Sequence, residues 1–225
     1  MAYPDLEGRG GAVHLLPLGA TEPHGPHAPL ATDTIISEGI SRRAADRLQG
    51  ELDVLVLPAV PFGVTRYGAD FPGAVSISEE TLRSLVTEIA ASFERVVLVN
   101  SHLEPEQVWT LRGLGLPLLD ITRRASAQRL TDEFQAGAGH AGRYETSLVL
   151  ADRPELVDQE RMRTLQAKMI DMPAAIRSGQ KSFLAMGMDE AYAGAPGDAT
   201  AEEGEQTFEA LVDMLVELIR EVAGR

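Results

Sequence analysis

The sequence predicts an α/β fold in which helices cover both faces of a mostly parallel sheet. Short apolar segments alternate with helical patterns over the first 120 residues, which is typical of parallel β-α units. Several of these segments contain almost no polar residue, as expected for strands that are buried on both faces. The chain has 225 residues, of which 44% are hydrophobic and 24% charged. This is enough for one core, so we expect a single domain over residues 1–225.

Four apolar runs are the expected strands, and they cover residues 13–18, 52–60, 96–99 and 116–121. Between them, apolar residues recur at helical spacing over residues 33–48, from Ser76 or Ser78 to Phe93, and over residues 105–112. A serine suits the cap of the second of these helices, and Pro105 suits the first turn of the third. Two further helices are expected, over residues 144–151 and along the C-terminal segment 208–222.

Composition argues against several classes of partner. The chain has 34 acidic and 20 basic residues, a formal charge of −14 that repels a nucleic-acid backbone. No apolar run approaches the roughly 20 residues that a membrane-spanning helix needs. The N-terminus lacks the basic and apolar parts of a signal peptide, and cysteine is absent, so we expect a cytoplasmic protein. We therefore expect neither a nucleic-acid nor a membrane partner.

A polar segment with metal-ligand residue types follows the first expected strand. In extended backbone, side chains two positions apart point to the same side, so Glu22 and His24 can converge. Asp33 lies where the next helix begins, and it is either the cap of that helix or a metal ligand. His14, inside the strand, is expected to be a core residue.

A second such segment follows the third expected strand, where His102 and Glu104 have the same spacing. Imidazole and carboxylate are ligands of Zn²⁺, Mn²⁺ and Fe²⁺. The two segments offer five candidate ligands, which are Glu22, His24, Asp33, His102 and Glu104. These suffice for two divalent metals if Asp33 bridges them.

A third segment carries His140 between glycines and Glu145 in the first turn of a helix. Imidazole titrates near neutral pH, so His140 suits a general acid or base. Glu145 could stabilise the helix through its dipole, orient His140, bind a metal or contact substrate. Tyr67, Arg66 and Arg143 are candidate substrate contacts, although both arginines could equally be surface charges.

The same segments resemble the creatininase (creatinine amidohydrolase) family. The Glu-x-His-Gly-x-His motif and its Thr-Asp lie in residues 22–33, and the His-Ala-Gly-x-x-Glu-Thr-Ser motif is complete over residues 140–147. Phe-Pro-Gly at 71–73 and the Gly-Asp…Ala-Thr-Ala-Glu-x-Gly pattern at 197–204 follow the family's order. Ala74, Leu103 and Pro105 depart from it, in place of threonine, tyrosine and asparagine.

This resemblance implies a three-layer α/β/α sandwich and a metal-dependent amidohydrolase, usually a homo-oligomer and often a hexamer. It implies the five residues above as metal ligands, His140 as catalytic acid/base and, because Glu104 is present, two metals per chain. We expect cleavage of a cyclic or linear amide C–N bond in a small molecule, with Glu145 supporting His140. The alternatives are a peptidase that trims a small modified peptide and a non-catalytic metal-binding family member.

Overall fold

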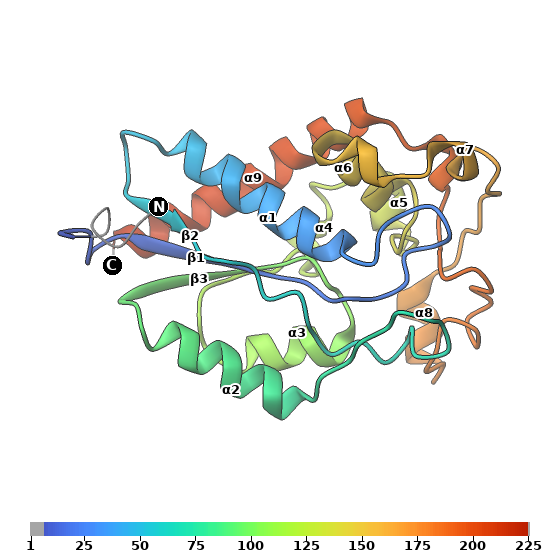
Figure 1. The fold of residues 1–225 in the computed structure, drawn as a ribbon, viewed down its shortest axis with the longest axis horizontal. Helices are drawn as coiled ribbons and strands as arrows, with labels where there is room; N and C mark the ends of the chain where they lie inside the picture. Colours follow the sequence, from blue (N-terminus) through green and yellow to red (C-terminus); the bar gives the residue numbers. More distant parts are fainter. Residues whose placement is uncertain (1–6, 225) are drawn as a thin grey trace.

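The structure is a computed structural model and describes residues 7–224. Within this range, one parallel sheet has the strand order β2-β1-β3-β4 (Figure 1). The strands are β1 (Val13–Leu18), β2 (Val54–Val56), β3 (Arg95–Asn100) and β4 (Leu118–Leu119). The two central strands pair along their whole length, from Val13 opposite Arg95 to Leu18 opposite Asn100. Their carboxyl ends therefore lie side by side.

The two edge strands are shorter than the apolar runs predicted. β2 covers three residues of the run 52–60. Beyond it, the Leu57 N–H still donates to the Leu15 carbonyl oxygen, and an isolated bridge joins Leu18 and Val60. Pro58 lacks the N–H that a ladder needs, which is a physical reason for this early end. β4 pairs through Leu118 and Leu119 alone. The predicted strands over the rest of 52–60 and 116–121 are wrong.

Helices cover both faces of the sheet, as expected for three layers (Figure 1). One face carries α1 (Thr32–Arg47), α6 (Arg143–Asp152) and α9 (Ala201–Ala223). The other carries α2 (Glu79–Ala90) and α3 (Pro105–Arg112). The Ser78 hydroxyl caps α2 by accepting the Thr81 N–H at 3.1 Å. Among the described residues, no helix is long and apolar enough to cross a membrane.

Helices α6 and α9 pack closely because a glycine lies where they meet. A Cβ at Gly204 would lie 1.9 Å from the backbone carbonyl oxygen of Ser147. α9 buries an apolar face that includes Phe208, Leu211 and Leu215. This contact fixes the position of α6, whose first turn carries Glu145.

Short elements between residues 124 and 198 lie toward the carboxyl ends of the strands (Figure 1). The sequence pattern did not predict them; they are α4 (Arg124–Ala127), α5 (Asp132–Gln135), η2 (Pro154–Leu156), α7 (Gln159–Met162), α8 (Met172–Arg177) and η3 (Pro196–Asp198). On the face of the sheet that α2 and α3 cover, Trp109 of α3 points away from the core and is 62% exposed.

Candidate metal centre and active site

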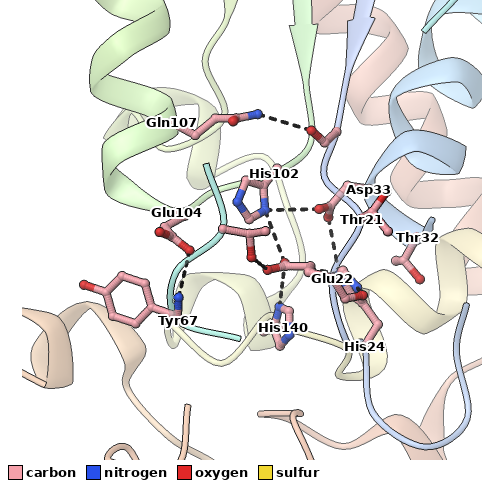
Figure 2. Close-up of polar contacts among 12 residues, drawn as sticks. Thr21, Glu22, His24, Thr32, Asp33, Tyr67, His102, Glu104, Gln107 and His140 are labelled. Atoms are coloured by element: carbon pink, nitrogen blue, oxygen red, sulfur yellow. Dashed lines mark hydrogen bonds and ion pairs between the residues drawn. The ribbon is translucent and has the colours of Figure 1, made fainter. Parts of the chain in front are cut away.

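The three polar segments singled out in the sequence meet beyond the carboxyl ends of β1 and β3 (Figure 2). The loop after β1 carries Glu22 and His24, and the turn after β3 carries His102 and Glu104. Asp33 comes from the first turn of α1. His140 precedes α6, and Glu145 lies in its first turn. All of these side chains are buried, with residue exposures of 8% or less.

Asp33 lies between two imidazoles. Its Oδ1 is 3.3 Å from His24 Nε2, and its Oδ2 is 3.1 Å from His102 Nδ1. Ala31 occupies the cap position of α1, and no side chain caps the helix there. The interpretation of Asp33 as the cap is therefore wrong. Its carboxylate is directed into the cluster instead.

Two groups of ligand-type atoms share Asp33. In the first group, Glu22 Oε1 lies 3.2 Å from His102 Nδ1, which also faces Asp33. In the second group, Glu145 Oε2 lies 3.4 Å from His24 Nε2, which also faces Asp33. We call these the first ligand group (Glu22, Asp33, His102) and the second ligand group (His24, Asp33, Glu145). Each contains one imidazole and two carboxylates, a donor set that suits a divalent transition metal.

Glu104 lies at the edge of the first group, within 4.8 Å of ligand atoms of Glu22 and His102. Its carboxylate accepts the backbone N–H of Arg66 at 2.8 Å and that of Tyr67 at 3.2 Å (Figure 2). Burial raises its pKa to about 7, although His102 and these N–H groups act in the opposite direction. Glu104 is thus held by backbone from a different loop.

Several buried atoms of the cluster lack a hydrogen-bond partner. Among the described residues, they include His24 Nε2 and Asp33 Oδ2. Buried polar atoms are normally paired, so unpaired atoms within a cluster of ligand-type groups need an explanation. A cation beside each of these atoms would supply the missing partner, and the residues therefore fit divalent metals.

The charges of the cluster compensate one another. Burial opposes ionisation of Glu22, but His102 and His140 outweigh it and lower the pKa of Glu22 to about 2. Burial also opposes protonation of His24, yet Asp33 and the glutamates raise its pKa to about 10. Burial raises the pKa of Glu145 to about 8, with His24 opposing this. In the absence of a cation, protons on imidazole balance the carboxylates.

His140 lies outside the two ligand groups that share Asp33, although one of its nitrogens is within 4.8 Å of ligand atoms of Glu22 and His24. Its Nε2 is 3.0 Å from the Pro23 carbonyl oxygen, and its Nδ1 is 3.7 Å from Glu22 Oε1. The ring packs between those of His24 and Phe183, with centroids 4.5 and 4.3 Å away. Burial and the neighbouring His24 lower its pKa to about 4. A neutral imidazole with one nitrogen facing the cluster can accept a proton there.

A cavity of about 310 Å³ opens onto these residues. Apart from the ligand-type side chains and Tyr67, its wall is largely apolar and includes Leu103, Pro105, Phe134, Met172, Ile176 and Phe183. Within residues 7–224, no lysine or arginine lines it. Arg66 instead pairs with Glu79, and Arg143 pairs with Asp132 and Glu203. The structure thus places Tyr67 at the cavity and both arginines in ion pairs outside it.

Sequence reasoning missed several residues that support the site. The Thr65 hydroxyl donates to Glu22, and Phe183 covers one face of His140. The Gln107 side-chain oxygen accepts the Val64 N–H beside the site. Thr65 and Phe183 lie on segments far from the ligand motifs in the sequence, whereas Gln107 follows Glu104 by three positions. None of the three belongs to a residue pattern that indicates a metal site. The one available signal was the position of Gln107 on the buried face of α3.

Comparisons with known proteins agree on one family. The family model described as creatinine amidohydrolase matches residues 1–219. Mycofactocin precursor peptide peptidase of Mycobacterium ulcerans is 35% identical over 216 residues, spanning 91% of this chain and 83% of that protein. Creatinine amidohydrolase of Pseudomonas putida is 29% identical over 261 residues, spanning 98% and 95%.

Solved structures give the same result. A crystal structure of creatinine amidohydrolase superposes with a TM-score of 0.75 at 27% identity, covering 99% of this chain and 96% of that one. A creatininase described as the Mn form gives 0.70 at 26% identity, with 98% and 96% covered. A mutant creatininase of the Zn-Zn type gives 0.74 at 26% identity, with 98% and 95% covered.

Proposed function

This chain belongs to the creatininase family and is a hydrolase of that family, and we propose that it uses two divalent cations to cleave an amide bond in a small modified peptide. The observation that carries this proposal is the position of Asp33. Its two oxygens face different imidazoles, each of which has a further carboxylate beside it. One carboxylate between two such groups is suited to bridge a metal pair.

Each ligand group would bind one of the two cations. The first ligand group would hold one cation and the second ligand group the other, with Glu104 at the edge of the first. Relative to the sequence-based roles, this assigns Glu145 to metal binding. Cations bound there supply water activation and polarisation of the scissile carbonyl. Related creatininase structures are described as a Zn-Zn type and as a Mn form. Zn²⁺ and Mn²⁺ both suit these ligands, as does Fe²⁺.

His140 would move the proton. Its Nε2 is held against the Pro23 carbonyl oxygen, so in the neutral ring Nδ1 carries the lone pair and faces Glu22. Nδ1 would take a proton from the attacking water and give it to the departing amide nitrogen. The apolar wall would exclude bulk water and bind the apolar part of the substrate. Tyr67 would place its ring against that substrate.

A peptide is favoured over creatinine by sequence similarity. The peptidase of Mycobacterium ulcerans is more similar in sequence than the Pseudomonas putida creatinine amidohydrolase, at 35% against 29% identity. Cleavage of creatinine or another non-peptide amide remains the second candidate because the cavity also fits a small molecule.

The test is hydrolysis by the full chain, loaded in turn with Zn²⁺, Mn²⁺ and Fe²⁺. A mycofactocin precursor peptide and creatinine are offered as alternative substrates, and products are followed by mass spectrometry. Metal-dependent release of a peptide fragment supports the proposal. Turnover of creatinine alone would favour the second candidate, and turnover that survives chelation would refute the metal mechanism. Sedimentation of the same sample tests the expected homo-oligomer.

A further inference from the structure

One short segment, residues 64–67, contacts three of the proposed metal ligands. The Val64 carbonyl oxygen lies 2.8 Å from His102 Nε2, and the Thr65 hydroxyl donates to Glu22. The next two backbone N–H groups donate to Glu104. We call residues 64–67 the ligand-support segment. Its position therefore sets the orientation of the first ligand group and Glu104.

The segment is not part of a helix or strand, and two side chains accept its backbone N–H groups: Ser76 Oγ accepts the Thr65 N–H at 3.0 Å, and Gln107 accepts that of Val64. Gln107 comes from α3 and is fully buried. Its Oε1 accepts the Val64 N–H at 2.8 Å. Val64 thus uses its N–H to contact Gln107 and its carbonyl to contact His102.

Gln107 also reaches His102 by a second route. Its Nε2 donates to Asn100 Oδ1 at 2.9 Å, and Asn100 Nδ2 donates to the His102 carbonyl oxygen at 2.6 Å. The imidazole and the backbone of His102 are therefore both tied to one carboxamide. When neutral, His102 keeps its proton on Nε2, toward Val64, and its lone pair on Nδ1, toward Glu22 and Asp33.

The Gln107 carboxamide packs directly against the backbone at Gly63. A Cβ on residue 63 would lie 2.4 Å from Gln107 Oε1, so a glycine is needed there. An apolar side chain at position 107 would leave the Val64 N–H and Asn100 Oδ1 buried without partners. Position 107 therefore requires a side chain that both accepts and donates a hydrogen bond.

We propose that Gln107 is a positioning residue for the metal site, acting on the first ligand group and not on the second. The inference rests on the proposed metal function. It names an asymmetry, because His24 and Glu145 have no contact with the ligand-support segment or with Gln107 in the hydrogen bonds of residues 7–224. Loss of partners that orient a ligand costs about 10–100-fold in metal affinity.

The experiment is Zn²⁺ titration of the metal-free full chain by calorimetry, in wild type and Gln107→Met. The methionine keeps the volume and removes the hydrogen bonds that the carboxamide makes to Val64, Asn100 and the Gly19 carbonyl oxygen. Val108→Ala is the matched control, because it shortens another buried side chain of α3 without touching the network. If the methionine variant does not fold, Gln107→Glu replaces it, since it retains the acceptor toward Val64 and removes the donor toward Asn100.

We expect one of two Zn²⁺ sites to weaken about 10–100-fold in the Gln107 variant while the other stays unchanged. The control is expected to melt at a lower temperature and bind both ions as wild type does. Equal weakening of both sites, or weakening in Val108→Ala as well, would show general loosening and overturn the inference. Unchanged binding in a folded Gln107 variant would also overturn it. Wild-type protein that binds no Zn²⁺ would instead refute the proposed function beneath it.

Discussion

Replacing Asp33 with alanine removes the side chain that faces both ligand groups, and we expect the variant to lose the thermal stabilisation that divalent cations give the wild-type protein. Both oxygens of Asp33 contribute, since they lie 3.3 and 3.1 Å from imidazoles of different groups. Removing any other ligand takes one donor from one group, whereas removing Asp33 takes a donor from each.

The size of the effect follows from mass action. A cation that binds only the folded state at 100 times its Kd stabilises it by about 2.7 kcal/mol. Two sites would give about 5 kcal/mol, which corresponds to a rise of roughly 10–20 °C in Tm for a chain of this size. We expect the Asp33→Ala variant to show almost none of this rise.

The assay is a thermal melt with chelator and with excess Zn²⁺, together with elemental analysis of the purified protein. Asp46→Ala is the matched control, because Asp46 is an exposed carboxylate on the same helix. It is expected to behave as wild type in both measurements. An Asp33→Ala protein that retains two metals and the full rise in Tm would refute the bridging role.

Three further changes probe other parts of the molecule. His140→Ala should keep the full metal content and lose about 10²–10⁴-fold in turnover of the peptide substrate, because a proton carrier is removed and no ligand is. Gly204→Ala should destabilise the fold by about 1–3 kcal/mol in urea unfolding, because its methyl group would overlap the Ser147 carbonyl. Asp120→Asn should cost about 1–3 kcal/mol at neutral pH, because Asp120 accepts a charged hydrogen bond from Arg112 at 2.7 Å.

The stability that the Asp120 carboxylate supplies should depend on pH, and the direction follows from its pKa. Burial raises its pKa, but hydrogen bonds from Arg112, Thr122 and Arg123 outweigh this, so the net pKa is below the ordinary value of 3.8. The unfolded chain then binds the proton more readily, and the stability that the carboxylate supplies is present above about pH 4. The difference between wild type and Asp120→Asn should shrink as the pH falls through the folded-state pKa. A difference that stays constant down to pH 2 would contradict this.

Specific outcomes would also contradict the predictions for His140→Ala and Gly204→Ala. Full turnover by His140→Ala would mean that another group carries the proton. If Gly204→Ala unfolds at the same urea concentration as wild type, α6 and α9 can separate without cost, and Gly204 does not set their contact.

The central strands and the ligand loops could be predicted because both depend on local sequence. The run 13–18 became β1 with the same bounds, and helix 105–112 begins at Pro105 as expected. Both edge strands exist, but their ends could not be predicted because an apolar run does not show how far the neighbouring strand pairs with it. β2 needs β1 beside it, and Pro58 interrupts the ladder although Leu57 and Val60 remain apolar.

The candidate site divides in the same way. His and carboxylate residues two positions apart after a strand point to one place whatever the rest of the chain does. The partner of Glu145 could not be predicted, because it depends on how α6 packs against the loop after β1. The same holds for the apolar wall, which comes from four- and six-residue helices too short to show a period. Gln107 looks like any polar residue on a helix until Val64 is placed beside it.

The outward position of Trp109 has a practical consequence for spectroscopy. It is the single tryptophan of the chain, and it is 62% exposed on the folded protein. Indole emission depends on the polarity around the ring, so the native protein should already fluoresce close to the wavelength of indole in water. Unfolding would then change the emission maximum very little, and events in the cavity would leave it untouched. Circular dichroism or calorimetry, rather than intrinsic fluorescence, is therefore the readout for the melts and titrations described above.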